Sequence, residues 1–330
     1  LIRSIKVRTK DIGIDLGTAN ILIYVKGEGI VLSEPSVVAI DKETGKVLAI
    51  GKKAHEMIGR TPLSVIAIKP LKDGVIADFD KTEIMLDYFI KKIKGKTIFS
   101  KPRILICCPS NTTQVEKNAI REVAERTGAK KVYVEEEPKV AAIGAGLEIK
   151  NPTGNMVIDI GGGTTDIAVL SLNGIVYSES IKIAGNTLDI DIIKYIKSKY
   201  KLLIGEVTAE NIKVKIGTTM SETKNKSMKV RGRDLLTGLP KTIEITSKEV
   251  KEAIYDSLEM IIHATKTVLE KIEPEISADI IDKGIVLTGG GALLDGLDKL
   301  IEKEIKVPVK VAERPLTCVV EGTGIILDNI

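Results

Sequence analysis

Two short stretches of the sequence combine the residue types that bind a phosphate group. The first is Asp15-Leu16-Gly17-Thr18 and the second is Asp159-Ile160-Gly161-Gly162-Gly163-Thr164. Glycine lets backbone N–H donors approach a phosphate closely, and a nearby carboxylate holds Mg²⁺ or its water ligands. Each stretch therefore predicts a phosphate-binding loop with an aspartate that holds a metal.

An ordinary glycine turn is the commoner explanation of a single Asp-x-Gly stretch. The second stretch is harder to explain in that way, because its three glycines are followed by two threonines and Asp166. Other nucleotide motifs fail on inspection. Gly45-Lys46 is followed by Val47 where a P-loop needs Ser or Thr, and 289–291 lacks the last glycine of a dinucleotide fingerprint. The matched loops thus remain as the phosphate site.

A third glycine cluster, Gly289-Gly290-Gly291, follows an apolar strand pattern and precedes a helical pattern that starts near Leu293. A strand–glycine–helix turn of this kind lets a flat base or a ribose approach the backbone. A closely packed turn between strand and helix explains the same glycines equally well. Both interpretations stay open.

Three consecutive acids, Glu135-Glu136-Glu137, end a predicted strand over 131–134. Such a run usually marks a solvated strand end. A carboxylate at a strand terminus, beside a cleft that holds a phosphate and a metal, is however well placed to orient an attacking water. One of the three is therefore a candidate catalytic residue.

The elements that must position these residues form an internal repeat. After each loop come an apolar strand, a glycine-containing turn and another strand, over 21–34 in the first half and 167–179 in the second. The two loops are about one domain length apart. We expect a duplicated domain whose loops face each other across a cleft.

Helices are predicted between the strands, so the fold class is α/β. Thr113 and Glu116 fit a capping box, and the apolar stripe that follows them includes Val115. Thr246 with Glu249 predicts a second helix start. The charged stretches 34–80 and 189–241 indicate inserted subdomains.

The amino-acid composition limits the possible binding partners and the cellular compartment. Across 330 residues the net charge is +4, from 49 basic and 45 acidic side chains, which predicts no nucleic-acid partner. Three cysteines cannot form a disulfide framework and indicate a reducing, cytoplasmic setting. No apolar run approaches the roughly 18 residues that span a bilayer. The two histidines are far apart, which gives a zinc site or a histidine triad little support.

Several longer phrases resemble the bacterial actin-like proteins of the MreB/Mbl family, over essentially the whole chain. The phrases are residues 15–20, 73–78, 136–138, 159–165, 171–174, 203–206, 287–291 and 315–317. The resemblance implies that Asp15 and Asp159 hold magnesium. It also implies that Glu137 and Thr164 orient the attacking water.

The resemblance further implies the nucleotide contacts. The phosphates are assigned to Gly17, Thr18, Ala19, Asn20, Gly161, Gly162, Gly163 and Thr164. Glu210 and Lys213 match the positions that contact the nucleoside, with Gly289, Gly290 and Gly291 on its opposite side. The cofactors implied are ATP/ADP and Mg²⁺.

The fold implied is a duplicated actin-like (ribonuclease H-like) α/β fold, with two lobes, four subdomains and a nucleotide cleft between them. The expected boundaries are 1–33 and 80–150, with the C-terminal helix 316–330, for subdomain IA; 34–79 for IB; 151–187 and 246–315 for IIA; and 188–245 for IIB. The activity implied is a weak ATPase coupled to polymerisation.

By the same resemblance the protein assembles with itself into double, usually antiparallel, protofilaments. These are expected on the inner face of the cytoplasmic membrane, where the family organises peptidoglycan synthesis and rod shape with cell-shape or wall-synthesis membrane proteins. From the residues, Ile98-Phe99 within a lysine-rich stretch and Leu1-Ile2 beside basic residues suit anionic lipid, at about 1 kcal/mol per cation. A solvated loop is the alternative that the residues alone leave open.

Three other functions share the loops. A chaperone ATPase module of the Hsp70 type normally continues into a long peptide-binding domain, and only a short stretch follows Gly291 here. In a sugar or acetate kinase a carboxylate deprotonates a hydroxyl instead of positioning water. A nucleotide-dependent scaffold with little hydrolysis, in a wall-less or motile bacterium, keeps the same fold.

Overall fold

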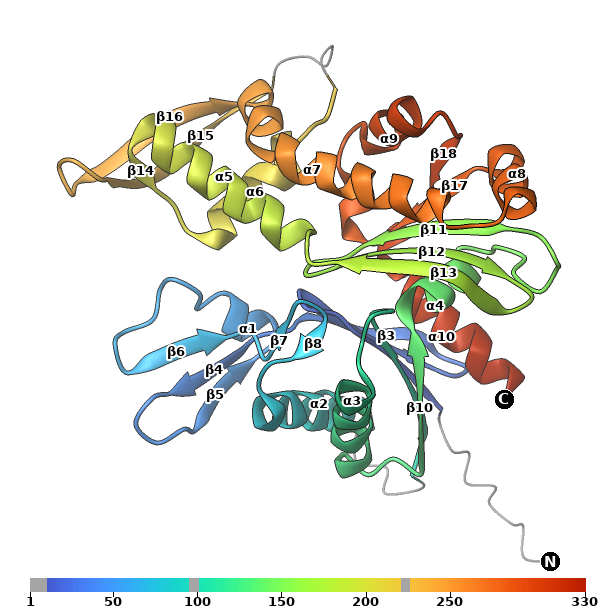
Figure 1. The fold of residues 1–330 in the computed structure, drawn as a ribbon. Coiled ribbons are helices and arrows are strands. Elements are labelled where there is room, and N and C mark those ends of the chain that lie inside the picture. Colours follow the sequence, from blue (N-terminus) through green and yellow to red (C-terminus); the bar gives the residue numbers. More distant parts are fainter. Residues whose placement is uncertain (1–10, 95–100, 221–225) are drawn as a thin grey trace, which may run out of the picture. The chain divides into compact units, whose positions relative to one another are not determined.

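The computed structural model describes residues 11–94, 101–220 and 226–330 (Figure 1). The chain divides into two compact units. The first extends to Gly146 and includes Thr317–Ile330, and the second is Leu147–Leu316. The four-subdomain division is finer than this, and it stays a prediction.

The first unit is built on a five-stranded sheet with the order β10-β9-β1-β2-β3. Strands β10, β9 and β1 are parallel, whereas β1, β2 and β3 pair antiparallel. Their bounds are β1 Ile12–Leu16, β2 Asn20–Val25, β3 Gly29–Pro35, β9 Arg103–Cys108 and β10 Lys131–Glu136.

The sheet of the second unit has the same topology, in the order β13-β12-β11-β17-β18. Strands β11, β12 and β13 pair antiparallel, and strands β11, β17 and β18 pair parallel. Strand β11, which precedes the loop, belongs to both sets. The bounds are β11 Asn155–Ile160, β12 Thr165–Ser171, β13 Gly174–Ile181, β17 Ile285–Thr288 and β18 Val309–Val311. The predicted repeat is confirmed, and it extends from three strands to five.

Smaller sheets are formed by strands of the charged stretches. In the first unit, β5-β4-β6 and β7-β8 comprise β4 Val38–Asp41, β5 Val47–Ile50, β6 Val65–Ile68, β7 Leu71–Lys72 and β8 Val75–Ile76. In the second unit, β14-β15-β16 comprises β14 Leu202–Leu203, β15 Ser227–Asp234 and β16 Pro240–Thr246.

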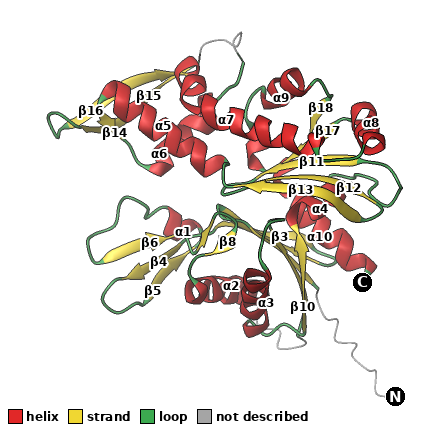
Figure 2. Ribbon diagram, viewed as in Figure 1, coloured by secondary structure: helices red, strands yellow, loops and turns green. Residues whose placement is uncertain are grey.

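Helices cover the sheets, and Figure 2 separates them from the strands by colour. Those of the first unit are α1 Lys52–His55, α2 Phe79–Lys94, α3 Gln114–Arg126, α4 Glu137–Gly144 and α10 Cys318–Asn329. Those of the second are α5 Gly185–Tyr200, α6 Glu206–Ile216, α7 Ser247–Glu270, α8 Pro274–Lys283 and α9 Leu297–Ile305. Short 3₁₀ turns cover Gly290–Leu293 and Pro315–Thr317. None of the described helices is both long enough and apolar enough to span a bilayer.

Both predicted capping boxes are present, at Thr113 before α3 and at Thr246 before α7. Two details of the helix predictions were wrong. Val115 is 78% exposed because it lies on the first turn of α3, away from the buried stripe that begins at Ile120. The helix expected near Leu293 begins at Leu297, because the glycines before it form a 3₁₀ turn instead.

Alternation along β1 sets the direction of the first aspartate. Ile12, Ile14 and Leu16 belong to one core cluster with residues of α2 and α3. Gly13 therefore faces the opposite side, where a Cβ would lie 1.8 Å from the Thr323 hydroxyl of α10. Successive side chains of a strand alternate between faces, so Asp15 lies on the same face as Gly13.

In the second unit the alternation is repeated on β11. Met156, Ile158 and Ile160 join the core formed with α5, α7 and the neighbouring strands. Asp159 consequently lies on the other face of its sheet. Each loop thus follows a strand that places its aspartate on the face opposite the core cluster, which is formed with α2 and α3 in the first unit and with α5 and α7 in the second.

Candidate functional site: two aspartate–glycine loops

The loop after β1 is held by hydrogen bonds from later parts of the first unit. The Ser36 hydroxyl donates to the Gly17 carbonyl at 2.7 Å, and the Gly74 N–H donates to the Thr18 Oγ1 at 2.9 Å. A Cβ on Gly17 would lie 2.7 Å from the Asn20 carbonyl oxygen, so this turn requires glycine. Because Thr18 is used as an acceptor, its hydroxyl hydrogen can be donated to a ligand.

The carboxyl ends of the parallel strands β1, β9 and β10 bring three sequence positions to one edge of the first sheet. Asp15 is the penultimate residue of β1, Cys107 is the penultimate residue of β9, and Glu137 follows β10. Burial raises the pKa of the Cys107 thiol well above its ordinary value, and the charges of Asp15 and Glu137 add to that shift. The metal-holding and water-orienting residues predicted for this unit are thus electrostatic neighbours.

The three consecutive acids have different surroundings. Glu135 pairs with Lys139 at 3.0 Å, and Glu136 pairs with Lys117 at 3.0 Å. Glu137 is the first residue of α4 and is 8% exposed. The two preceding acids are therefore engaged in ion pairs, and Glu137 is the buried carboxylate at the strand end.

The second aspartate is more deeply enclosed than an ordinary carboxylate. Asp159 is 5% exposed, its Oδ1 accepts a 2.6 Å hydrogen bond from the Thr288 hydroxyl, and its partner on β12 is Asp166. Burial raises the pKa of Asp159 to about 7, the Thr288 bond opposes that shift, and the charge of Asp166 adds to it. Two buried acids on paired positions favour the approach of a cation.

Backbone bonds fix the second loop against the start of α5. The Gly161 N–H donates to the Thr164 carbonyl at 2.9 Å. The N–H groups of Gly185 and Asn186 donate to the carbonyls of Gly161 and Gly162 at 3.1 and 2.8 Å. Thr164 is buried, 5% exposed, within this arrangement. These bonds hold the loop in one defined backbone conformation against the start of α5.

The two predicted nucleoside contacts lie on α6, three residues apart. The Lys213 ammonium pairs with Asp189 at 2.8 Å and donates to the Gly185 carbonyl at 2.7 Å. Glu210 is exposed. Lys213 therefore anchors the start of α5 through Asp189 and the Gly185 carbonyl. Asp189 was not among the site residues predicted from the sequence.

The glycine triplet packs against the second loop. A Cβ on Gly289 would lie 2.4 Å from the Ile160 carbonyl oxygen, and one on Gly291 would lie 2.2 Å from the Ile160 side chain. Gly289 also has a φ of +78°, which favours glycine. Close packing therefore accounts for Gly289 and Gly291, and contact with a base stays a prediction.

The residues suit magnesium by their chemistry. Carboxylate oxygens are preferred Mg²⁺ ligands, and Mg²⁺ is commonly held by one or two carboxylates together with water and substrate phosphates. Among the described residues no three His, Cys, Asp or Glu side chains form a metal-ligating group. Each loop aspartate, Asp15 in the first unit and Asp159 in the second, has the chemistry of a ligand to a metal that takes its remaining ligands from phosphate and water.

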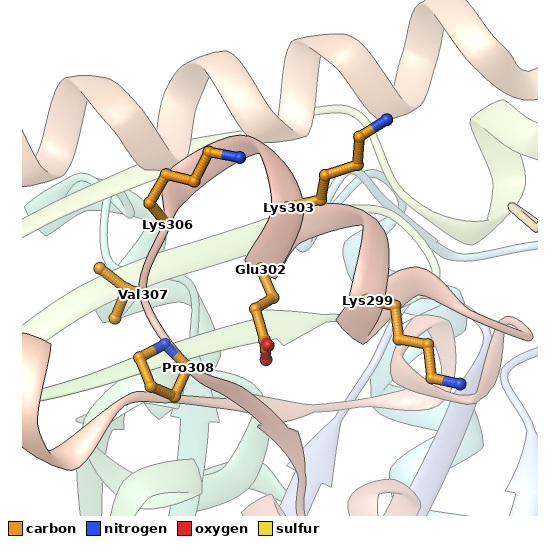
Figure 3. A pocket seen from close by; sticks show the side chains of 6 residues that line it. All are labelled: Lys299, Glu302, Lys303, Lys306, Val307 and Pro308. Carbon is orange, nitrogen blue, oxygen red and sulfur yellow. The ribbon is translucent and has the colours of Figure 1, made fainter.

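A pocket of about 400 Å³ lies elsewhere in the second unit, lined by Lys299, Glu302, Lys303, Lys306, Val307 and Pro308 (Figure 3). It precedes β18, so it lies at the amino ends of the parallel strands, opposite to the edge of Asp159. The three ammonium groups do not converge on one point in Figure 3. It is not part of the loop site.

The four predicted membrane residues, Leu1, Ile2, Ile98 and Phe99, lie outside the described residues. Their role stays a prediction. The same holds for the ligand contacts of both loops, whose residues lie in separate units.

Two units with the same sheet topology and a matched aspartate–glycine loop define an actin-like α/β protein. The family described as MreB/Mbl protein matches residues 9–330. The chain belongs to the MreB/Mbl family, and this decides against the chaperone and metabolic kinase alternatives.

Individual relatives are similar over almost their entire length. The cell shape-determining protein Mbl of Bacillus cereus is 63% identical, covering 97% of this chain and 96% of that protein. The cell shape-determining protein MreB of Escherichia coli strain K12 is 51% identical, covering 98% and 94%. The crystal structure of MreB5 of Spiroplasma citri bound to AMPPNP has a TM-score of 0.94 at 42% identity, covering 97% and 96%. The same protein bound to ADP has a TM-score of 0.94 at 41% identity.

The raised pKa of Asp159 predicts a pH-dependent stability. The folded protein keeps a proton on this group up to about pH 7, whereas the unfolded chain loses it near the ordinary value of 3.8. Because only the unfolded chain releases this proton between pH 3.8 and about 7, the free energy of unfolding falls as pH rises through that range. Asn does not titrate, so Asp159→Asn should remove this pH dependence. The free energy of unfolding of the variant should therefore rise relative to the wild type by up to about 1.4 kcal/mol per pH unit between pH 5 and 7.

Urea denaturation of the metal-free protein at several pH values measures this difference. If the difference in free energy of unfolding between Asp159→Asn and the wild type is constant from pH 5 to 8, burial does not hold the proton on Asp159.

Proposed function

We propose that this protein binds Mg-ATP and Mg-ADP through both aspartate–glycine loops and uses the nucleotide to control self-assembly. The observation that carries the proposal is the duplicated loop, with Asp15 and Asp159 at equivalent positions on sheets of the same topology. The Spiroplasma citri relative bound to AMPPNP and to ADP supports it.

The roles follow from the chemistry of each residue. Asp15 and Asp159 hold the metal, which supplies charge neutralisation of the phosphates when bound. Backbone N–H groups of the two loops, with the Thr18 hydroxyl, bind phosphate oxygens. Lys213 and Glu210 contact the nucleoside from α6.

Hydrolysis requires a water held in line with the γ-phosphate. Glu137 and Thr164 orient that water by accepting its hydrogen bonds. The water oxygen would bond to the γ-phosphorus while the bond from the γ-phosphorus to the oxygen it shares with the β-phosphate breaks, which gives ADP, inorganic phosphate and a released proton. Lys139, two positions after Glu137, pairs with Glu135 at 3.0 Å.

The cellular role proposed is that of a cytoskeletal filament that determines cell shape, in walled cells by organising peptidoglycan synthesis. Close relatives named for cell-shape determination support this role. The filament is a double protofilament of this chain, cytoplasmic and peripheral on the inner face of the membrane. Its partners are anionic lipid and the membrane proteins of cell shape or wall synthesis.

Nucleotide-dependent assembly is the direct test of this function. Purified protein incubated with Mg-ATP should form filaments visible by negative-stain electron microscopy and sediment on ultracentrifugation, whereas protein without nucleotide should stay in the supernatant. A protein that remains monomeric with Mg-ATP and phosphorylates a small metabolite would contradict the proposal.

Replacing Glu137→Ala should separate binding from hydrolysis. Because the water loses the carboxylate that orients it, phosphate release should fall at least about 100-fold, while AMPPNP affinity changes little. Glu135→Ala is the matched control, since it removes a neighbouring acid that is engaged with Lys139. Unchanged phosphate release in Glu137→Ala would refute the assignment.

The membrane contact is tested with Ile98 and Phe99 both changed to Ser. Losing the apolar contribution should markedly reduce co-sedimentation with vesicles that contain anionic lipid. Leu63→Ser is the control, because Leu63 is an apolar side chain that is 93% exposed on a different loop. Equal losses in the two variants, or no loss in the double variant, would argue against a specific membrane loop.

A further inference from the structure

The duplicated sheets allow the two aspartates to be compared position by position. Asp15 is paired with Leu22 on β2, and Asp159 is paired with Asp166 on β12. On the parallel side, Asp159 is paired with Thr288 of β17. Ile14 is paired with Ile106 of β9, so the position equivalent to Thr288 is Cys107. The two aspartates therefore have chemically different neighbours at equivalent positions.

The difference concerns hydrogen bonding. A threonine hydroxyl is a strong donor, whereas a cysteine thiol is a weak one. Thr288 is fully buried, and its hydroxyl donates to the Asp159 Oδ1 at 2.6 Å. The Cys107 thiol instead lies in the field of Asp15, which helps to keep it protonated. Only the second loop has an aspartate held by a neighbouring hydroxyl at this position.

The Thr288 bond restrains the carboxylate group. Among the described residues, Thr288 is the one hydrogen-bond donor to the Asp159 side chain. Its backbone is fixed in β17 and leads directly into the closely packed glycine turn. A bond from a rigid strand to Oδ1 sets the rotation of the carboxylate and leaves Oδ2 for another partner.

We propose that Thr288 is a positioning residue, whose hydroxyl orients the Asp159 carboxylate so that it can bind Mg²⁺ together with the nucleotide. This inference rests on the proposed function. Hydrogen-bonding partners of metal ligands commonly change metal affinity by about 10- to 100-fold when they are removed. The effect is expected on metal-dependent binding, and not on nucleotide contacts that need no metal.

The test compares Thr288→Val with Thr288→Ser. Valine replaces the hydroxyl with a methyl group of similar size, and serine keeps the hydroxyl. Isothermal titration with AMPPNP, at a series of Mg²⁺ concentrations and in EDTA, separates the metal-dependent part of the affinity. In Thr288→Val the Mg²⁺ concentration for half-maximal binding should rise about 10-fold or more, with affinity in EDTA nearly unchanged. Thr288→Ser should behave like the wild type.

A matched control is Thr265→Val on α7. Thr265 is also fully buried, and its hydroxyl donates to the Ile261 carbonyl at 2.8 Å, within the same unit. It should leave Mg²⁺ dependence unchanged, and circular dichroism melts of all variants report any general loss of stability.

Three results would overturn the proposal. They are a Thr288→Val variant with wild-type Mg²⁺ dependence, an equal loss of affinity in EDTA, and a Thr288→Ser variant as impaired as Thr288→Val. A wild-type protein that fails to bind AMPPNP with Mg²⁺ would instead overturn the proposed function itself, and the two failures are thereby distinguished.

Discussion

A carboxylate buried at the end of an apolar strand is the constraint on which the second unit depends. Asp159 is the penultimate residue of a strand whose other side chains are almost entirely buried, and burial raises the pKa of Asp159 to about 7. Leaving such a group without a partner is costly, and here Thr288 supplies a hydrogen bond from the next strand. The glycine turn after Thr288 then packs on Ile160. Loop, strand end and turn are thus fixed by one another.

The sheet topology alone brings the side chains of each candidate site together. Carboxyl ends of parallel strands meet at one edge, so Asp15 and Glu137 lie close together although they are far apart in sequence. The second unit applies the same order of strands to Asp159 and Thr288. The repeated topology therefore gives two similar sheet edges, and the different neighbours, Cys107 and Thr288, give each aspartate its own environment.

Much of this was predictable from the sequence, because glycine, capping and strand alternation are local signals. The repeat, the class α/β and both capping boxes are confirmed. Val115 was misplaced because a helical stripe does not tell which turn of a helix reaches the core. The pair of Lys213 with Asp189 depends on the packing of α6 against α5, which spacing does not encode. Roles of Glu210, Lys213 and Glu137 came from family resemblance and stay predictions.

The central claim is that both loops contact one nucleotide. Stoichiometry tests it most directly, by isothermal titration of the wild type with AMPPNP in Mg²⁺ and of variants in which one loop aspartate, Asp15 or Asp159, is changed to Ala. The account predicts one site per chain, and strongly weakened binding in either variant. Two sites per chain, or a variant that keeps one site of full affinity, would contradict it.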